Sequence, residues 1–169
     1  MSQGFKVTYA TLTADNHELH AKLDAAIDKI RFELGRTHAL FVNGKPRPTE
    51  EHTESLCPND TRIVVARAAS ATPNDVASAV AAAKAAFPAW RQTPWQTRAD
   101  LVEKAAKLIR ERLFDLTAWL ILEMGKNRVE ALGEVEETAD LYEYYAHQLR
   151  QNDGFVRKMS ALSKTDTNT

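Results

Sequence analysis

The stretch that decides the fold spans residues 123–146 and reads EMGKNRVEALGEVEETADLYEYYA. Beyond Asn127, apolar residues recur at steps of three and four, which places them along one face of an α-helix. This face comprises Val129, Leu132, Val135, Ala139, Tyr142, Ala146 and Leu149. The pattern is the most regular in the chain, and it predicts a long helix that packs against other elements.

A second line of residues follows the opposite side of this predicted helix. It comprises Glu130, Glu134, Glu137, Leu141 and Tyr144. An acidic helix face is usually solvated, which is the simpler interpretation. If Leu141 and Tyr144 are covered instead, Glu137 lies at the edge of a buried region, where its carboxylate can meet an ammonium group. The periodicity leaves both interpretations of Glu137 open and by itself favours the solvated one.

Residues 71–150 are expected to form a helical layer. Thr72 offers a capping oxygen, Pro73 suits the first helical turn, and Asp75 is an early carboxylate, so a helix is expected to start there. Its narrow stripe of mostly small residues suits close packing against another element. The stripe comprises Val76, Ala79, Val80, Ala83 and Phe87. Pro88 is expected to end or kink this helix.

A second helix start is expected at Thr93, because Thr93-Pro94-Trp95-Gln96 matches a capping box with proline at the first helical position. The apolar stripe that follows continues to Gly125, which is the expected C-cap. A break is expected within residues 113–115.

Residues 38–70 carry the strand signals. Asn43-Gly44 supplies the two positive-φ positions of a type I′ turn and predicts a hairpin. Further strands are expected at residues 55–57 and 63–68, on either side of a turn that begins with Pro58. The predicted fold class is therefore mainly α with a small antiparallel β-hairpin or sheet.

The two ends of the chain differ from this middle part. Residues 1–37 are expected to form a helical arm, with Thr13 as N-cap and Gly35 as the stop. Such an arm lies either on the body of the protein or on a neighbouring subunit. Residues 151–169 turn polar and are expected to be an extended or disordered link.

Composition narrows the classes of function. Apolar residues make up 44% and charged residues 27% of the chain, as in globular proteins. The 22 basic and 23 acidic residues nearly cancel, which argues against nucleic acid binding. No apolar run reaches the roughly 18 residues of a membrane helix. We therefore expect a cytoplasmic protein.

The usual catalytic and nucleotide-binding motifs are absent from the sequence. There is no glycine-rich dinucleotide turn, no P-loop and no nucleophile elbow. The single cysteine, Cys57, precedes a Pro-led turn without an activating base, so it is interpreted as a structural thiol. No Cys/His set has metal-ligand spacing. No catalytic residue and no metal site are expected in this chain.

Several segments occur in the order and spacing of the aldehyde dehydrogenase family, which the chain resembles. These are Ala86-Phe87-Pro88-Ala89-Trp90, Arg98, the predicted helix at residues 101–109, and Glu123-Met124-Gly125-Lys126. Within that family, three further segments are similar to the pyrroline-5-carboxylate (glutamate semialdehyde) dehydrogenases. They are Phe41-Val42-Asn43-Gly44-Lys45, Met124-Gly125-Lys126-Asn127 with Val129-Glu130-Ala131, and Tyr142-Glu143-Tyr144-Tyr145-Ala146.

The resemblance implies that the chain is the N-terminal part of an α/β aldehyde dehydrogenase fold. It implies an NAD-dependent oxidation of L-glutamate γ-semialdehyde to glutamate in proline catabolism, through a cysteine thiolate and a general-base glutamate. The counterparts of those residues, and most of the NAD site, would lie beyond Thr169, so this chain alone is expected to be inactive. The resemblance also implies that Glu137 lies near the amino group of the substrate.

Two alternatives remain at this point. The chain could be a non-catalytic helical module that binds a full-length subunit through its exposed stripes. Alternatively, the family is right and the substrate is another small aldehyde. Partners other than the substrate would be a second copy of the chain or a full-length subunit.

Overall fold

The computed structural model describes residues 16–157, and most of them are helical. The elements follow the chain in the order α1 (His17–Arg31), β1 (Arg36–His38), β2 (Leu40–Val42), β3 (Lys45–Arg47), β4 (His52–Cys57), β5 (Asp60–Ala69), α2 (Pro73–Gln92), α3 (Trp95–Glu111), α4 (Leu113–Met124), α5 (Arg128–Gln151) and the short 3₁₀ helix η1 (Asp153–Phe155). The predicted class, mainly α with small sheets, is confirmed. None of the described helices combines the length and the apolar character that crossing a membrane requires.

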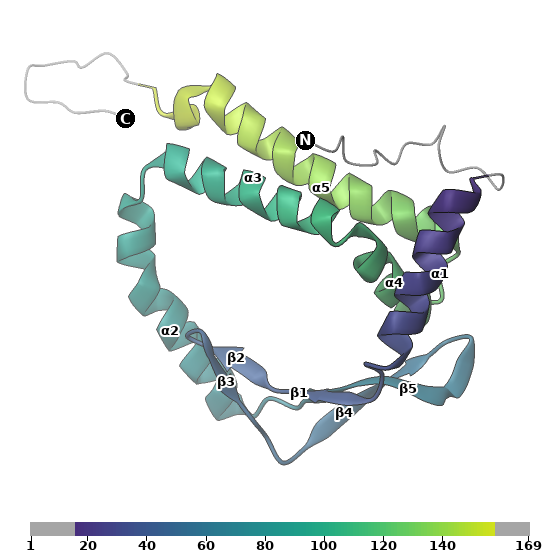
Figure 1. Ribbon diagram of the computed structural model, residues 1–169. Helices are drawn as coiled ribbons and strands as arrows, with labels where there is room; N and C mark the ends of the chain where they lie inside the picture. The colour runs from purple at the N-terminus through teal and green to yellow at the C-terminus, as the bar shows by residue number, and fades with distance from the viewer. Residues whose placement is uncertain (1–15, 158–169) are drawn as a thin grey trace, which may run out of the picture.

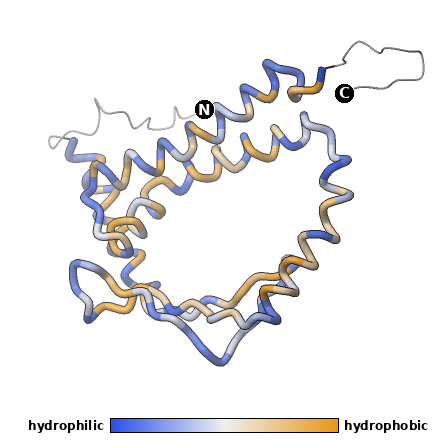
Figure 2. The backbone as a smooth tube through the Cα atoms, turned by 180° about the vertical axis from the view of Figure 1, so that it is seen from behind, coloured by the Kyte–Doolittle hydropathy of each residue, from blue (hydrophilic) through white to orange (hydrophobic). Residues whose placement is uncertain are grey.

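Helices α1, α4 and α5 enclose the core. Leu19 and Leu23 of α1 pack with Leu113 of α4 and Leu132 of α5, because the apolar residues of each helix recur on one face. A second cluster, formed by Ala26, Ile30, Ala118 and Leu122, continues the α1–α4 contact. Figure 1 shows α1 lying across α4, and hydrophobic residues gather at this junction in Figure 2. The helical arm therefore lies on the body of the same chain.

Two ion pairs fix the position of α1. Lys29 of α1 lies 2.5 Å from the Asp115 carboxylate of α4, and Asp24 of α1 pairs with Arg128 at the start of α5. The helix begins after Asn16, whose side chain accepts a hydrogen bond from the backbone N–H of Leu19. The expected cap, Thr13, lies outside the described residues.

The strands form two separate sheets. β2 and β3 are an antiparallel hairpin, and Asn43 and Gly44 at its turn have φ angles of 53° and 70°, as predicted. The other sheet has the order β1-β5-β4. β4 and β5 are antiparallel, but β1 runs parallel to β5. The antiparallel pairs were predicted, whereas the parallel β1–β5 pair was not, because a parallel pair joins segments far apart in sequence and leaves no turn signal.

Helix α2 stands apart from the other helices. Figure 1 shows it rising from the β2–β3 hairpin to the start of α3, on the other side of the molecule from α4. Thr72 caps it in a capping box with Asp75, as predicted. Pro88 lies inside the helix, which continues to Gln92. The carbonyl that loses its donor belongs to Lys84, on an exposed part of the helix, where water can replace the lost bond.

The later helix boundaries differ slightly from expectation. Thr93 does not cap α3, which begins after Pro94 without a side-chain cap. The Thr93 hydroxyl instead donates to the Ala89 carbonyl. The break between α3 and α4 falls at Arg112, one residue before the predicted interval. At the C-terminal end, η1 follows α5, and residues 158–169 lie outside the described part of the chain.

Candidate functional site on helix α5

The start of α5 is fixed by a left-handed glycine and an asparagine cap. Gly125 ends α4 with φ 70°, and a Cβ at this position would lie 3.2 Å from Cγ of Pro58 in the β4–β5 turn. The side chain of Asn127 then accepts a hydrogen bond from the backbone N–H of Glu130. Gly125 and Asn127 thus fix the two ends of the short connection between α4 and α5. Within α5, the helical repeat then determines which side chains share a face.

The predicted apolar face of α5 packs against the rest of the molecule. Its buried members are Ala131, Leu132, Val135, Ala139 and Ala146. Val129 and Tyr142, which the sequence placed on the same face, are more than 40% exposed. The small residues allow α5 to lie close to α3, which runs beside it in Figure 1.

Glu137 lies on the opposite, exposed side of α5. Its helical neighbours Leu141 and Tyr144 are 46% and 55% exposed, and the Tyr144 ring stands edge-on to that of Tyr145, with ring centroids 5.4 Å apart. Within residues 16–157, no hydrogen bond or ion pair to the Glu137 carboxylate is found. The carboxylate is therefore open to a partner from outside the described residues.

The other acidic residues of the same line have different surroundings. Glu134 forms an ion pair with Lys126, and this hydrogen bond raises the pKa of the Lys126 ammonium. Glu130 is exposed near the start of the helix. Glu137 is thus the member of the line that combines an uncommitted carboxylate with apolar neighbours one turn further along the helix.

A groove of about 1020 Å³ lies along α3 and α5 and reaches the start of α4. Arg110 of α3 lines this groove: its guanidinium donates to Glu136 at 3.1 Å and also to Asp140 and Glu143. Burial by itself would lower the pKa of the Arg110 guanidinium. The hydrogen bonds to Glu143 and Glu136 have the larger combined effect and raise this pKa. The sequence analysis did not single out Arg110, although Glu136, Asp140 and Glu143 recur at steps of four and three.

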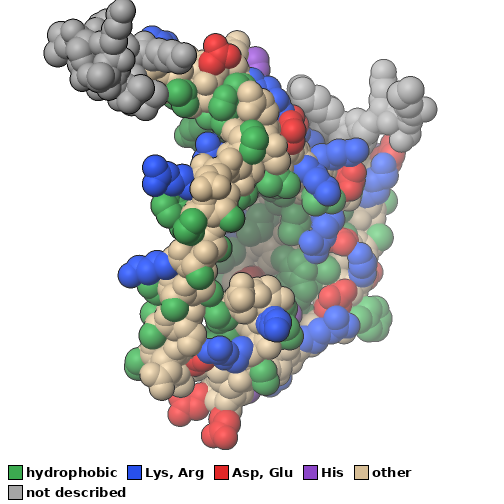
Figure 3. Space-filling view, turned by 90° about the vertical axis from the view of Figure 1, so that its left-hand side faces the viewer, with side chains coloured by type: hydrophobic (Ala, Val, Ile, Leu, Met, Phe, Trp, Pro, Cys, Tyr) green, Lys and Arg blue, Asp and Glu red, His purple; other side chains and the backbone are tan. Residues whose placement is uncertain are grey.

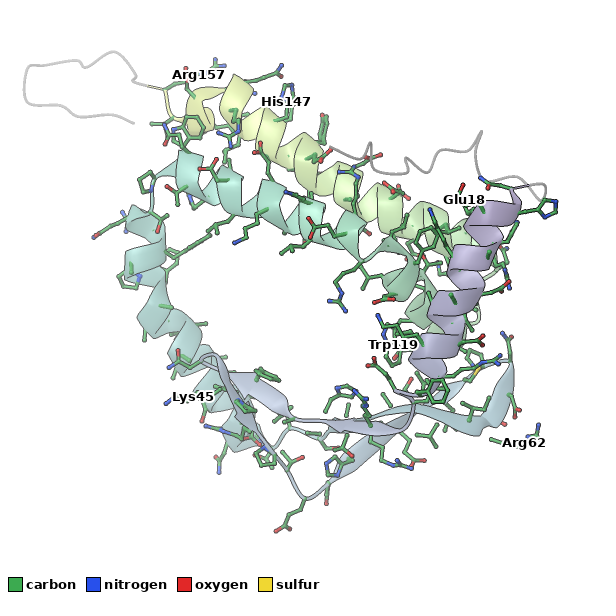
Figure 4. All side chains as sticks on the ribbon, in the orientation of Figure 1. Glu18, Lys45, Arg62, Trp119, His147 and Arg157 are labelled. Carbon is green, nitrogen blue, oxygen red and sulfur yellow. The ribbon has the colours of Figure 1, made fainter. Side chains whose placement is uncertain are left out.

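This groove does not fit NAD. Its charged and titratable lining consists of Glu103, Lys107, Arg110, Glu111, Glu136, Asp140, Glu143 and His147; His147 lies near the C-terminal end of α5 (Figure 4). Five carboxylates against two permanent cations give a negative surface that disfavours a pyrophosphate, and the guanidinium of Arg110 is already taken by three carboxylates. No step that uses NAD is therefore assigned to the described residues.

Cys57 has a structural position. It is 4% exposed at the end of β4, and it is a free thiol. Ser55 on the same strand hydrogen-bonds Glu123 at the end of α4, at 3.2 Å. No group of three or more His, Cys, Asp and Glu side chains suited to a metal ion occurs among residues 16–157.

Comparison with known proteins identifies the family. The family model for the aldehyde dehydrogenase family matches residues 45–169. Among curated proteins, the 1-pyrroline-5-carboxylate dehydrogenase of Geobacillus thermodenitrificans is 36% identical over 131 residues, which are 77% of this chain and 25% of the relative. That of Staphylococcus aureus is 34% identical over 124 residues, 73% of this chain and 24% of the relative. The chain spans about a quarter of the length of these relatives.

Solved structures give the same result. A variant of Thermus thermophilus 1-pyrroline-5-carboxylate dehydrogenase is similar with a TM-score of 0.83 and 33% identity, over 96% of this chain and 32% of that chain. A Thermus 1-pyrroline-5-carboxylate dehydrogenase with bound NAD has the same TM-score at 32% identity and the same coverage. The Mycobacterium tuberculosis enzyme, at 22% identity and a TM-score of 0.73 over 92% of this chain and 29% of that chain, shares the fold. The chain belongs to the aldehyde dehydrogenase family and resembles the N-terminal segment of its 1-pyrroline-5-carboxylate dehydrogenases.

Proposed function

We propose that this chain forms the N-terminal part of a cytoplasmic, NAD-dependent aldehyde dehydrogenase that oxidises L-glutamate γ-semialdehyde to glutamate. The support is the agreement of two comparisons on one kind of enzyme, since the curated relatives and the Thermus structures described above are 1-pyrroline-5-carboxylate dehydrogenases. NAD is bound in a Thermus relative, and in the assembled enzyme its site would be built by parts that this chain does not supply.

Glu137 is the proposed contact of this chain with the substrate. Glutamate semialdehyde carries an ammonium group next to its carboxylate, and an ammonium pairs well with a carboxylate that is not already neutralised. Glu137 has such a carboxylate on the exposed side of α5. When the rest of the enzyme covers this side, water is excluded and the charge pair is strengthened.

The role of Glu137 is tested in a chimera in which this chain replaces the matched quarter of the Geobacillus thermodenitrificans enzyme. Glu137→Ala is expected to raise the KM for glutamate semialdehyde by about tenfold, because a lost charge-assisted contact of about 1.4 kcal/mol corresponds to that factor. The KM for 5-oxopentanoate, which lacks the ammonium group, is expected to stay unchanged. Steady-state formation of NADH measures both.

A matched control distinguishes a contact from a general charge effect. Glu130→Ala removes a carboxylate from the same exposed side of α5 and is expected to change neither KM. If Glu137→Ala leaves the KM for glutamate semialdehyde unchanged while the chimera is active, Glu137 does not contact the ammonium group of the substrate; this is the result expected if the natural substrate is another aldehyde.

A further inference from the structure

The exposed carboxylate of Glu137 can bind a substrate ammonium only if the charged side chains around it leave it free. A neighbouring cation would neutralise it, and a neighbouring free carboxylate would compete with it for the same ammonium. Side chains of both signs are intermixed on this protein, as the face in Figure 3 shows. The residues next to Glu137 on α5 therefore decide whether its carboxylate stays available.

Glu134 is the carboxylate that precedes Glu137 by three residues on α5. Side chains three residues apart are neighbours on a helix surface, with Cβ atoms about 5–6 Å apart. Long side chains also lean toward the helix N-terminus, so Glu137 reaches back toward the turn that carries Glu134. An ammonium held by Glu134 would be shifted by about 4.5 Å along the helix. A reacting carbonyl must lie within about 3–3.5 Å of its nucleophile, so a substrate shifted in this way cannot react.

Lys126 occupies this competing carboxylate. Its ammonium forms an ion pair with Glu134, and the Glu134 oxygen that faces it is buried, so this pair is screened less than a fully exposed one. The hydrogen bond with Glu134, and then the charge of Glu130, raise the pKa of Lys126. Lys126 is thus a cation beside the acidic line of α5 whose charge is already used.

The connection between α4 and α5 holds Lys126 in place. Gly125 before it is left-handed and lies against Pro58, and Asn127 after it caps α5. A lysine at the end of α4 suits the dipole of that helix, but its ammonium lies at Glu134, about two turns along α5. The direction of the Lys126 side chain is therefore set by the ion pair and not by helix capping alone.

We propose that Lys126 is a positioning residue for the substrate, which pairs with Glu134 so that neither of them interferes with the binding of the substrate's ammonium to Glu137. This inference rests on the proposed function and adds the residue that determines which carboxylate binds the ammonium. The pair acts in both directions: Lys126 prevents Glu134 from competing for the ammonium, and Glu134 prevents Lys126 from neutralising Glu137.

The two halves of the pair are tested in the active chimera with the Geobacillus thermodenitrificans enzyme. Lys126→Met is expected to lower kcat and KM for glutamate semialdehyde together, each by about twofold, because two carboxylates of similar affinity each hold half of the bound substrate. Glu134→Gln is expected to raise KM by about threefold at unchanged kcat, because the released Lys126 forms a surface ion pair with Glu137.

The double variant Lys126→Met/Glu134→Gln removes both charges and is expected to return both constants to those of the unchanged chimera. The kcat for 5-oxopentanoate, which has no ammonium group, is expected to stay unchanged in all three variants, whereas a purely structural ion pair would affect both substrates. Lys107→Met is the matched control, because it removes a lysine that faces Glu111 on α3, and it is expected to change neither constant.

A measurement on the full chain tests the pairing without any activity. A carbon NMR titration of the Lys126 side chain is expected to show a lower pKa in Glu134→Gln and an unchanged pKa in Glu137→Gln. The double variant Glu134→Gln/Glu137→Gln is expected to lower it further, because the ammonium turns to Glu137 only when Glu134 no longer holds it.

Equal losses of kcat for both substrates in Lys126→Met, or no recovery in Lys126→Met/Glu134→Gln, would overturn the inference. So would a Lys126 pKa that falls in Glu137→Gln as much as in Glu134→Gln. The proposed function fails separately, since an unchanged KM for glutamate semialdehyde in Glu137→Ala contradicts the substrate contact itself. If Glu137→Ala raises that KM, unchanged constants in both Lys126→Met and Glu134→Gln contradict the role of Lys126 alone.

Discussion

At the scale of single residues, Gly154 shows how closely the C-terminal end is packed. Gly154 has φ 71°, a region that L-residues with a side chain rarely adopt. A Cβ added there would lie 2.5 Å from Cδ1 of Trp95, at the start of α3. Because Gly154 has no side chain, the turn after α5 can lie against the Trp95 ring. This contact joins the end of α5 to the start of α3.

Gly154→Ala is expected to lower the free energy of unfolding by about 2 kcal/mol, because it combines backbone strain with overpacking. Urea denaturation monitored by circular dichroism measures the change. Gly133→Ala is the control, since a Cβ at Gly133 meets nothing within 4 Å and alanine favours a helix interior. A Gly154→Ala protein as stable as the Gly133→Ala protein would show that Trp95 moves aside freely.

Arg110 is the second residue whose surroundings predict a measurable effect. Three carboxylates share its guanidinium, and the Glu136 side chain is only 13% exposed. Removing the cation therefore leaves a nearly buried carboxylate without its partner.

Arg110→Met is expected to lower the free energy of unfolding at pH 7 by about 2 kcal/mol, the typical value of a hydrogen bond to a charged group. Lys107→Met on the same helix is the control: Lys107 is mostly exposed and lies 3.9 Å from Glu111, so it should change stability by less than about 0.5 kcal/mol. Chemical denaturation of both variants compares them, and equal losses would rule out a special role of the α3–α5 ion pairs.

At the scale of elements, the start of α2 was predictable because its signals are local. Thr72, Pro73 and Asp75 lie within four residues, and Thr72 and Asp75 satisfy each other's hydrogen bonds in a capping box. The hydroxyl of Thr72, then its backbone N–H, and then the Arg47 guanidinium lower the pKa of Asp75 to about 2. The sequence indicated the cap, whereas the contribution of Arg47 depends on the hairpin lying next to α2.

The pH dependence of this helix start follows from the lowered pKa. An unfolded Asp titrates at about 3.9, so the carboxylate stabilises α2 fully above about pH 4, and the effect is lost as the pH falls through about 2. A carbon NMR titration of the Asp75 carboxyl is expected to show a midpoint near 2 that rises in Thr72→Val. Thr72→Ser keeps the hydroxyl and should keep the low midpoint. Equal midpoints in all three proteins would exclude the capping hydroxyl as the cause.

At the scale of the whole molecule, the described part of the chain has a core on one side only. Helices α1, α4 and α5 enclose it, whereas none of the residues of α2 is buried. The described residues thus have the structure of one segment of the aldehyde dehydrogenase fold. The chain spans about a quarter of the length of its curated relatives.

The purified chain alone is expected to form no NADH from NAD and glutamate semialdehyde. Its only cysteine is buried at a strand end, and the groove along α3 and α5 is too acidic for a dinucleotide. Absorbance at the NADH band measures the rate, with the active chimera as the positive control. Steady NADH production that Cys57→Ser abolishes would overturn this expectation.

The sequence by itself determined the mainly α fold class and the aldehyde dehydrogenase family. It also determined the hairpin at Asn43-Gly44, the start of α2 at Thr72 and the end of α4 at Gly125. These features depend on hydrogen bonds and backbone angles within a few residues, or on motif order along the chain. Only the tertiary structure decided that β1 pairs in parallel with β5, that α2 continues past Pro88, and that Arg110 collects three carboxylates while Glu137 stays open. Each of these outcomes depends on contacts or solvent exposure that arise only when distant segments meet, and periodicity along one helix cannot specify them.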